Sequence, residues 1–242
     1  MKAVLMFTSI AWLFLIVGGT QEYAWSILES PLDAVTVTGR VLLHGQQPTP
    51  HMIAVKVDTS TCGTSVANTR VIRNPRTAGL ANAVVSLEGV RNERGDVVSD
   101  MPHKVAIANV HCTFSPQVKA AQVGQVVEIR NEDPILHNTH ITLDQRTVLN
   151  VAQLPGGRPV SKGLKKAGRH VVRCDKHKFM GASLMVFDHP YYAVTDESGS
   201  YQLPPVPPGR YTIRVWHESL GVLTQDIEVS SPQRSSVDFT YR

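Results

Sequence analysis

The sequence is poor in the features that define several protein classes. Phe, Trp and Tyr together make up only 6% of its 242 residues, and the net charge is a mild +4. It lacks the aromatic and basic stripe expected of a nucleic-acid-binding domain, so no nucleic-acid partner is predicted. It also carries no catalytic motif that would define a substrate. These absences argue against an enzyme, and we expect none of its residues to be catalytic.

Cysteine is scarce as well, with three residues in the whole chain: Cys62, Cys112 and Cys174. In an exported protein, three cysteines predict one disulfide and one unpaired thiol. A pair formed by Cys62 and Cys112 leaves Cys174 free, although the other two pairings stay open at this stage.

The N-terminus predicts export. Met1 and Lys2 precede an apolar run from Ala3 to Val17, which is typical of a secretory signal peptide and short for a membrane span. We assign residues 1–26 to this signal, with cleavage after either Gly19 or Ser26. The protein is then periplasmic or secreted, with no stable membrane span; an uncleaved N-terminal anchor is the alternative.

After this segment the sequence predicts β-structure throughout. Short apolar strands alternate with Gly- and Pro-containing turns, as at 35–43, 52–57 and 210–217, which indicates an antiparallel β-sandwich architecture. In Gln125–Arg130 the side chains of Val127 and Ile129 share one face, which is typical of a half-buried strand. Polar residues 59–76 predict a loop. The predicted fold class is therefore all-β.

A seven-residue loop, Cys174–Met180, combines a thiolate, an imidazole and a thioether. Thiolate and thioether sulfur suit copper, and two His with one Cys and a weak axial Met form the ligand set of blue-copper sites. Zinc is the competing metal, but it makes little use of thioether. Predicted strands lie on both sides of the loop and would hold it rigidly.

The second imidazole is expected from His137. This residue follows the turn cluster Asn131–Pro134 at the beginning of a predicted strand. His140 lies three positions further on, where strand alternation places it on the opposite face, so we do not expect it to be a ligand. No His-x-His array for a multicopper oxidase is present.

These two segments resemble the cupredoxins, and the compact Cys-x2-His-x2-Met loop is similar to that of the amicyanin type. The resemblance covers residues 104–188 and implies a Greek-key β-sandwich with one type 1 copper ion. It makes His137, Cys174, His177 and Met180 the metal ligands. It also implies that the His177 imidazole lies near the surface as the electron port. Asn138 is expected to hydrogen-bond across to the ligand loop and hold it in place without binding the metal itself.

Two further segments resemble the carboxypeptidase regulatory-like, or transthyretin-like, β-sandwich: 195–211 matches its later strands, and the region of Gly39 its first strand. Exported proteins that join both modules are labelled methylamine-utilisation proteins, and the mature chain is similar to that group. The predicted domains are 1–26 (signal peptide), 35–95 (N-terminal β segment), 100–188 (cupredoxin) and 189–242 (carboxypeptidase regulatory-like segment). The segment 35–95 either begins a transthyretin-like sandwich split by the cupredoxin or supplies early cupredoxin strands.

The combined expectation is an exported blue-copper protein that transfers single electrons. The alternatives are a copper-binding or delivery protein and a structural β-sandwich interaction module. A redox partner, either a cytochrome or a periplasmic dehydrogenase, is expected at the Lys- and Arg-rich surface near residues 162–178, where basic charge would steer an acidic protein.

Overall fold

The computed structural model describes residues 34–90, 103–230 and 235–242. Almost all regular structure in these residues is β-strand, which confirms the all-β fold class. The described residues belong to one compact unit of the chain, residues 33–242. Within them, no helix is both long enough and apolar enough to cross a membrane. The predicted signal peptide, residues 1–26, lies outside the described residues.

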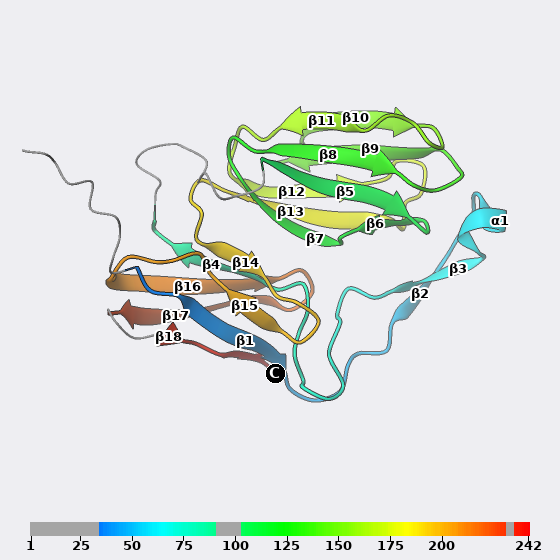
Figure 1. The fold of residues 1–242 in the computed structure, drawn as a ribbon. Helices are drawn as coiled ribbons and strands as arrows, with labels where there is room; N and C mark the ends of the chain where they lie inside the picture. The colour runs from blue at the N-terminus through cyan, green and yellow to red at the C-terminus, as the bar shows by residue number, and fades with distance from the viewer. Residues whose placement is uncertain (1–33, 91–102, 231–234) are drawn as a thin grey trace, which may run out of the picture. The chain divides into compact units, whose positions relative to one another are not determined.

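One sandwich, which we call the terminal sandwich, combines strands from both ends of the described chain (Figure 1). One of its sheets has the order β15-β1-β18, with β19 also pairing with β1, and the other has the order β14-β4-β16-β17. Its strands are β1 (Val37–Leu43), β4 (Val84–Glu88), β14 (Tyr192–Val194), β15 (Ser200–Gln202), β16 (Gly209–His217), β17 (Gly221–Val229), β18 (Ser235–Ser236) and β19 (Phe239–Tyr241). Strands before residue 90 therefore pair with strands after residue 190.

The core of the terminal sandwich explains this pairing. Val37 and Val41 of β1 have no exposed surface, and they pack in one apolar cluster with Leu87 of β4 and Val215 of β16. Burial of such side chains is the main favourable contribution to the fold. Gly39 lies between the two valines at a close approach, because a Cβ atom there would collide with the backbone carbonyl of Val237.

The central sandwich is formed by the chain between these two parts. Its sheets have the orders β10-β9-β12-β13-β7 and β11-β8-β5-β6. Its strands are β5 (Lys104–Val110), β6 (Thr113–Ser115), β7 (Val118–Gln122), β8 (Val126–Asn131), β9 (His137–Leu143), β10 (Arg146–Gln153), β11 (Val160–Gly163), β12 (Gly168–Arg173) and β13 (Gly181–Phe187).

The predicted alternation in β8 is confirmed. Val127 and Ile129 are fully buried, whereas Glu128 and Arg130 form an ion pair on the other face. The pairing is not purely antiparallel, since β5 pairs with β8 and β7 with β13 in parallel. Parallel neighbours require long connections instead of hairpins, and this chain order cannot be inferred from strand patterns alone.

Residues 51–68, which we call the cap, differ from the prediction. The sequence predicted two strands around a turn at 35–57 followed by a loop. Instead, β1 pairs within the terminal sandwich, and β2 (His51–Ala54) pairs with β3 (Ser65–Asn68) around the one-turn helix α1 (Thr59–Cys62). Both cap strands are largely exposed, so their apolar pattern was too weak to predict the pairing.

Candidate metal centre

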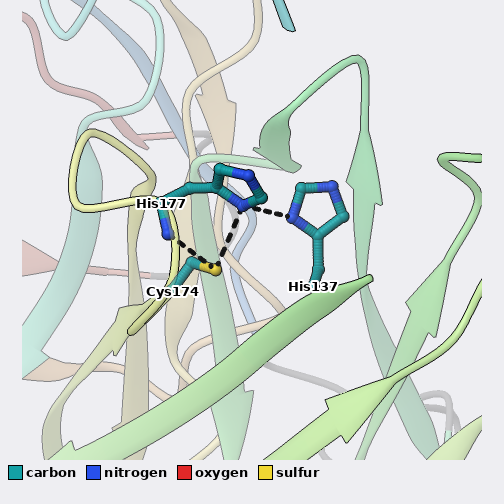
Figure 2. A group of neighbouring side chains, drawn as sticks. All are labelled: His137, Cys174 and His177. Carbon is teal, nitrogen blue, oxygen red and sulfur yellow. Dashed lines mark hydrogen bonds between the residues drawn. The ribbon is translucent and has the colours of Figure 1, made fainter. Parts of the chain in front are cut away.

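Three of the four predicted ligands converge in the central sandwich. The Nδ1 atoms of His137 and His177 are 3.1 Å apart, and the Sγ atom of Cys174 is 3.6 Å from Nδ1 of His177 (Figure 2). One donor atom from each residue lies within 4.8 Å of the other two, and all three side chains are buried. Two donors that each lie about 2.0–2.3 Å from one metal ion are at most about 4.5 Å apart, so both measured separations fit a shared metal.

The local structure explains why these side chains meet. His137 begins β9, whose side chains alternate between buried and half-buried, and its imidazole is on the buried face. Cys174 follows the last residue of β12, which pairs with β9. The loop beyond Cys174 closes on itself, because the Met180 amide donates to the His177 carbonyl at 2.9 Å and the Cys174 amide donates to the Met180 carbonyl at 3.4 Å.

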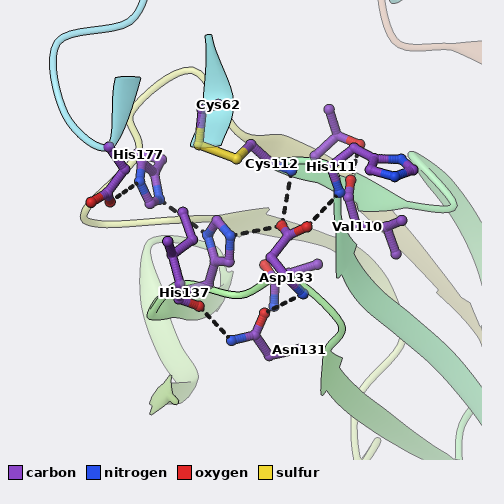
Figure 3. Close-up of polar contacts among 12 residues, drawn as sticks. Cys62, Val110, His111, Cys112, Asn131, Asp133, His137 and His177 are labelled. Atoms are coloured by element: carbon purple, nitrogen blue, oxygen red, sulfur yellow. Dashed lines mark hydrogen bonds and ion pairs between the residues drawn. A yellow bond between two sulfur atoms is a disulfide. The ribbon is translucent and has the colours of Figure 1, made fainter. Parts of the chain in front are cut away.

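Asp133 holds the far side of the His137 ring. Its Oδ2 atom is 2.8 Å from His137 Nε2 and also accepts the Cys112 amide at 2.9 Å, while its Oδ1 accepts the His111 amide at 2.6 Å (Figure 3). Asp133 is itself buried. A carboxylate behind the imidazole fixes the orientation and tautomer of a metal-ligating histidine.

Asp58 occupies the equivalent position behind His177. Its Oδ2 atom lies 2.8 Å from His177 Nε2 and 2.6 Å from Lys176 Nζ. Hydrogen bonds from Lys176 and His177 hold the pKa of the Asp58 carboxyl below its usual value. Asp58 is 119 residues away from His177 in the chain and belongs to the cap.

The two carboxylates determine what the facing nitrogens can do. An ionised carboxylate only accepts hydrogen bonds, so Nε2 of each imidazole is assigned the proton. In the neutral rings both Nδ1 atoms then present lone pairs to each other, 3.1 Å apart and close to a buried sulfur. A shared proton is disfavoured because burial, and then the neighbouring His177, lower the pKa of His137. A cation at this point would satisfy all three donors.

The Cys174 sulfur is held by backbone amides. The His177 amide donates to it at 3.3 Å and the Asn138 amide at 3.5 Å. Asn138 also links the two ligand segments with its side chain, because its Oδ1 accepts the Asp175 amide at 3.1 Å. Its Nδ2 donates to Asn150 Oδ1 at 2.6 Å, which anchors the side chain to β10.

Met180 is buried in the same apolar cluster as Cys174. It lies at the end of the ligand loop, directly before β13. Its burial beside Cys174 is compatible with a weak axial contact.

The expected surface position of His177 is wrong. The side chain has 0% of its area exposed, and the ring contacts Asp58 on one side and Phe179 at a centroid distance of 5.7 Å. The reason is the cap, which supplies Asp58 and has no counterpart in the ligand-loop pattern.

Cys62 and Cys112 form a disulfide, with a sequence separation of 50 residues, and this bond ties the cap to the central sandwich. Cys174 is the free cysteine. Cys112, Asp133 and His137 also lie together, but the sulfur of Cys112 is in the disulfide and is no thiolate ligand. His140 faces away from the three donors and contacts Asp175 and Thr147.

The basic residues of the segment 162–178 do not form one uniform patch. Arg169 is next to Glu218 and stacks over Trp216, and Lys176 pairs with Asp58. Arg173 and Lys178 instead line a hollow of about 520 Å³ together with Cys174, Asp175, His140 and Thr142.

Sequence reasoning missed the two carboxylates. Asp133 lies four residues before His137, within the predicted turn Asn131–Pro134, so its short distance in sequence from the predicted ligand was a usable signal. Asp58 gave no such signal, since only the tertiary structure brings the cap to the ligand loop.

Comparison with known families supports the second resemblance. A model described as "Carboxypeptidase regulatory-like domain" matches residues 170–242. The match begins within β12, earlier than the predicted segment 189–242. A comparison with curated protein sequences gave no significant match.

Among solved structures, the chain is weakly similar to copper proteins. A Cu-containing nitrite reductase from Thermus scotoductus SA-01 is 23% identical over 39% of this chain and 25% of its own, with a TM-score of 0.32. The reduced Cu(I) form of an amicyanin mutant at pH 4 is 15% identical over 43% of this chain and 98% of its own, also with a TM-score of 0.32. The matched part of this chain thus spans about a quarter of the nitrite reductase.

Proposed function

We propose that this protein is an exported type 1 (blue) copper protein that carries out one-electron transfer. His137, Cys174 and His177 are the principal ligands and Met180 is the weak axial ligand in this proposal. The observation that carries it is the convergence of two imidazole Nδ1 atoms and one cysteine sulfur in a buried position, with both Nε2 atoms already bound to carboxylates.

The donor set favours copper over zinc. Zinc sites use Cys, His and carboxylate ligands. Here the carboxylates of Asp133 and Asp58 face the Nε2 atoms and are turned away from the shared point between the donors. The fourth nearby candidate is a thioether, which suits copper.

A copper ion bound at this point would supply Cu(I)/Cu(II) one-electron chemistry. The protein holds the donors in place: β9 positions His137, and the hydrogen-bonded loop positions Cys174 and His177. Carboxylates fix both rings and two amides fix the sulfur. Donors that are held this firmly move little when one electron is gained or lost, which favours rapid transfer.

The proposal includes a partner and a location. We propose that a redox protein with an acidic surface, a cytochrome or a periplasmic dehydrogenase, docks at the basic segment near residues 162–178. Arg173 and Lys178 support this, because they line the same hollow as Cys174. We also propose a periplasmic or secreted location after removal of residues 1–26, and a role as an electron carrier without enzymatic activity.

The test is to express residues 27–242, add Cu(II), and record the visible spectrum. We expect an intense thiolate-to-copper charge-transfer band, and we expect Cys174→Ser to abolish it. A colourless protein, or a Cys174→Ser variant with the same band, contradicts the proposal. Copper binding without the visible band, and removal of that copper by mild chelators, would favour the delivery alternative. A protein whose stability does not depend on the metal and that shows no redox couple would favour the structural alternative.

A further inference from the structure

The cap has little apolar packing to hold it in place. Neither cap strand contains a buried residue, and α1 contains none either. Val55, with 6% of its area exposed, is the buried apolar residue between them. The cap is tied to the central sandwich by the Cys62–Cys112 disulfide and by the contacts of Asp58.

These tethers converge on the proposed metal centre. Cys112 donates its amide to Asp133, which in turn holds His137, so the disulfide ends next to one ligand. Asp58 directly precedes α1 and reaches the other imidazole, His177. Figure 3 shows the disulfide beside Asp133 and His137. The cap therefore contacts His177 directly through Asp58, and through the disulfide it is linked to Cys112, whose amide binds the carboxylate behind His137.

The cap also closes the Met180 end of the ligand loop. Ile53 and Val66 of the cap line a small cavity of about 40 Å³ together with Phe179 and Met180. The His177 ring, which Asp58 contacts, has no exposed area. A partner protein cannot reach the His177 ring while the cap is in this position.

We propose that Asp58 is a positioning residue of the metal centre, and that the cap shields His177 from solvent and partners. The inference rests on the proposed function and extends it: retention of the metal depends on a carboxylate that is contributed from outside the central sandwich. Outer-shell partners of ligating histidines typically change metal affinity about 10- to 100-fold when they are removed.

The first measurement needs no metal. Metal-free protein is treated with diethyl pyrocarbonate, which modifies accessible imidazoles, and His177 modification is quantified by peptide mass spectrometry. We expect His177 to be protected in the wild type and modified at least severalfold faster in the Cys62→Ser/Cys112→Ser and Asp58→Ala variants. Equal protection in all three proteins overturns the shielding role.

The second measurement uses copper-loaded protein and a chelator in excess. We expect Asp58→Ala to release copper about 10- to 100-fold faster than the wild type, with a shifted charge-transfer band, and Asp58→Asn to be intermediate because its amide oxygen can still accept from Nε2. The matched control is Asp226→Ala, an exposed aspartate on β17. Lys176→Met separates the contribution of the exposed ion pair, which is expected to be small.

The two failures are distinguishable. If the wild type is colourless with Cu(II), the proposed blue-copper function fails, and the labelling experiment still decides whether the cap shields His177. If the wild type is blue but Asp58→Ala releases copper at the rate of Asp226→Ala with an unchanged band, the positioning role of Asp58 is wrong while the copper function stands.

Discussion

Asp133 accepts a hydrogen bond from His137 at 2.8 Å from a position four residues earlier in the chain, across the turn that joins β8 to β9. The same carboxylate accepts the backbone amides of His111 and Cys112. A single buried acid thus supports a proposed ligand, the corner after β5 and the anchoring point of the disulfide.

Removal of this acid should affect stability and metal binding together. Asp133→Ala removes the acceptor of the part-buried His111 amide and of the buried Cys112 amide, and the loss at the buried amide alone costs about 1–3 kcal/mol. It also frees the His137 ring, and we expect a loss of copper affinity of about 10- to 100-fold. Urea unfolding of the metal-free protein and a competition titration with a chelator measure the two effects separately.

Two variants control this prediction. Glu132→Gln changes the exposed neighbouring acid and should leave both quantities unchanged. Asp133→Asn keeps one oxygen but turns an amide group toward an N–H donor, so it should be intermediate. Wild-type copper affinity in a folded Asp133→Ala protein would show that the contact to His137 has no outer-shell role.

Gly39→Ala should destabilise the terminal sandwich. The added Cβ atom would collide with the backbone carbonyl of Val237, which cannot move away as a flexible side chain would. We expect a loss of about 1–3 kcal/mol of unfolding free energy, the usual cost of overpacking. Gly163→Ala on β11 is the control, because a Cβ atom there meets nothing within 4 Å.

Urea unfolding monitored by circular dichroism compares these two variants. Equal midpoints would mean that β1 does not pack against the C-terminal segment, and would contradict the arrangement in which residues before 90 and after 190 share a sandwich.

Stability should fall as the pH is lowered from about 7.5 to 5. Burial lowers the pKa of His217, and the nearby Glu218 only partly opposes this. The unfolded chain, with an ordinary histidine pKa near 6.5, then binds more protons than the folded one, so the contribution is present above that pH and is lost below it. The slope is at most about 1.4 kcal/mol per pH unit for each such histidine.

His217 is suited to this test because it is far in sequence from the proposed ligands and is 1% exposed. Its Nδ1 accepts the Ser219 amide at 3.2 Å, and its ring lies 6.2 Å from that of Tyr241. In a Cys174→Ser background, His217→Asn should flatten the dependence of unfolding free energy on pH. An unchanged slope would show that His217 does not titrate with a depressed pKa.

Much of the candidate site was predictable because its residues are local. Cys174, His177 and Met180 lie within seven residues, and donor type alone indicated a soft metal. His137 could be predicted as a ligand from its position directly after a turn. The convergence of His137 with Cys174 and His177 required β9 to pair with β12, which depends on contacts between residues about 30 positions apart.

The fold was predictable as a class and less so in its connections. Alternation in β8 reflects a half-buried strand and is a local property. The partners of β1 are set by which apolar faces fit together, and the sequence around residues 35–57 was equally compatible with a hairpin. The domain boundaries at 35–95, 100–188 and 189–242 stay a prediction.

By itself the sequence determined the all-β class and the chemistry of the loop Cys174–Met180, because strand alternation and donor identity are properties of short segments. Only the tertiary structure decided that Asp58 of the cap lies behind His177 and that this ring is buried. That contact joins residues 119 positions apart and is supported by a disulfide and an ion pair, so no local sequence pattern could predict it.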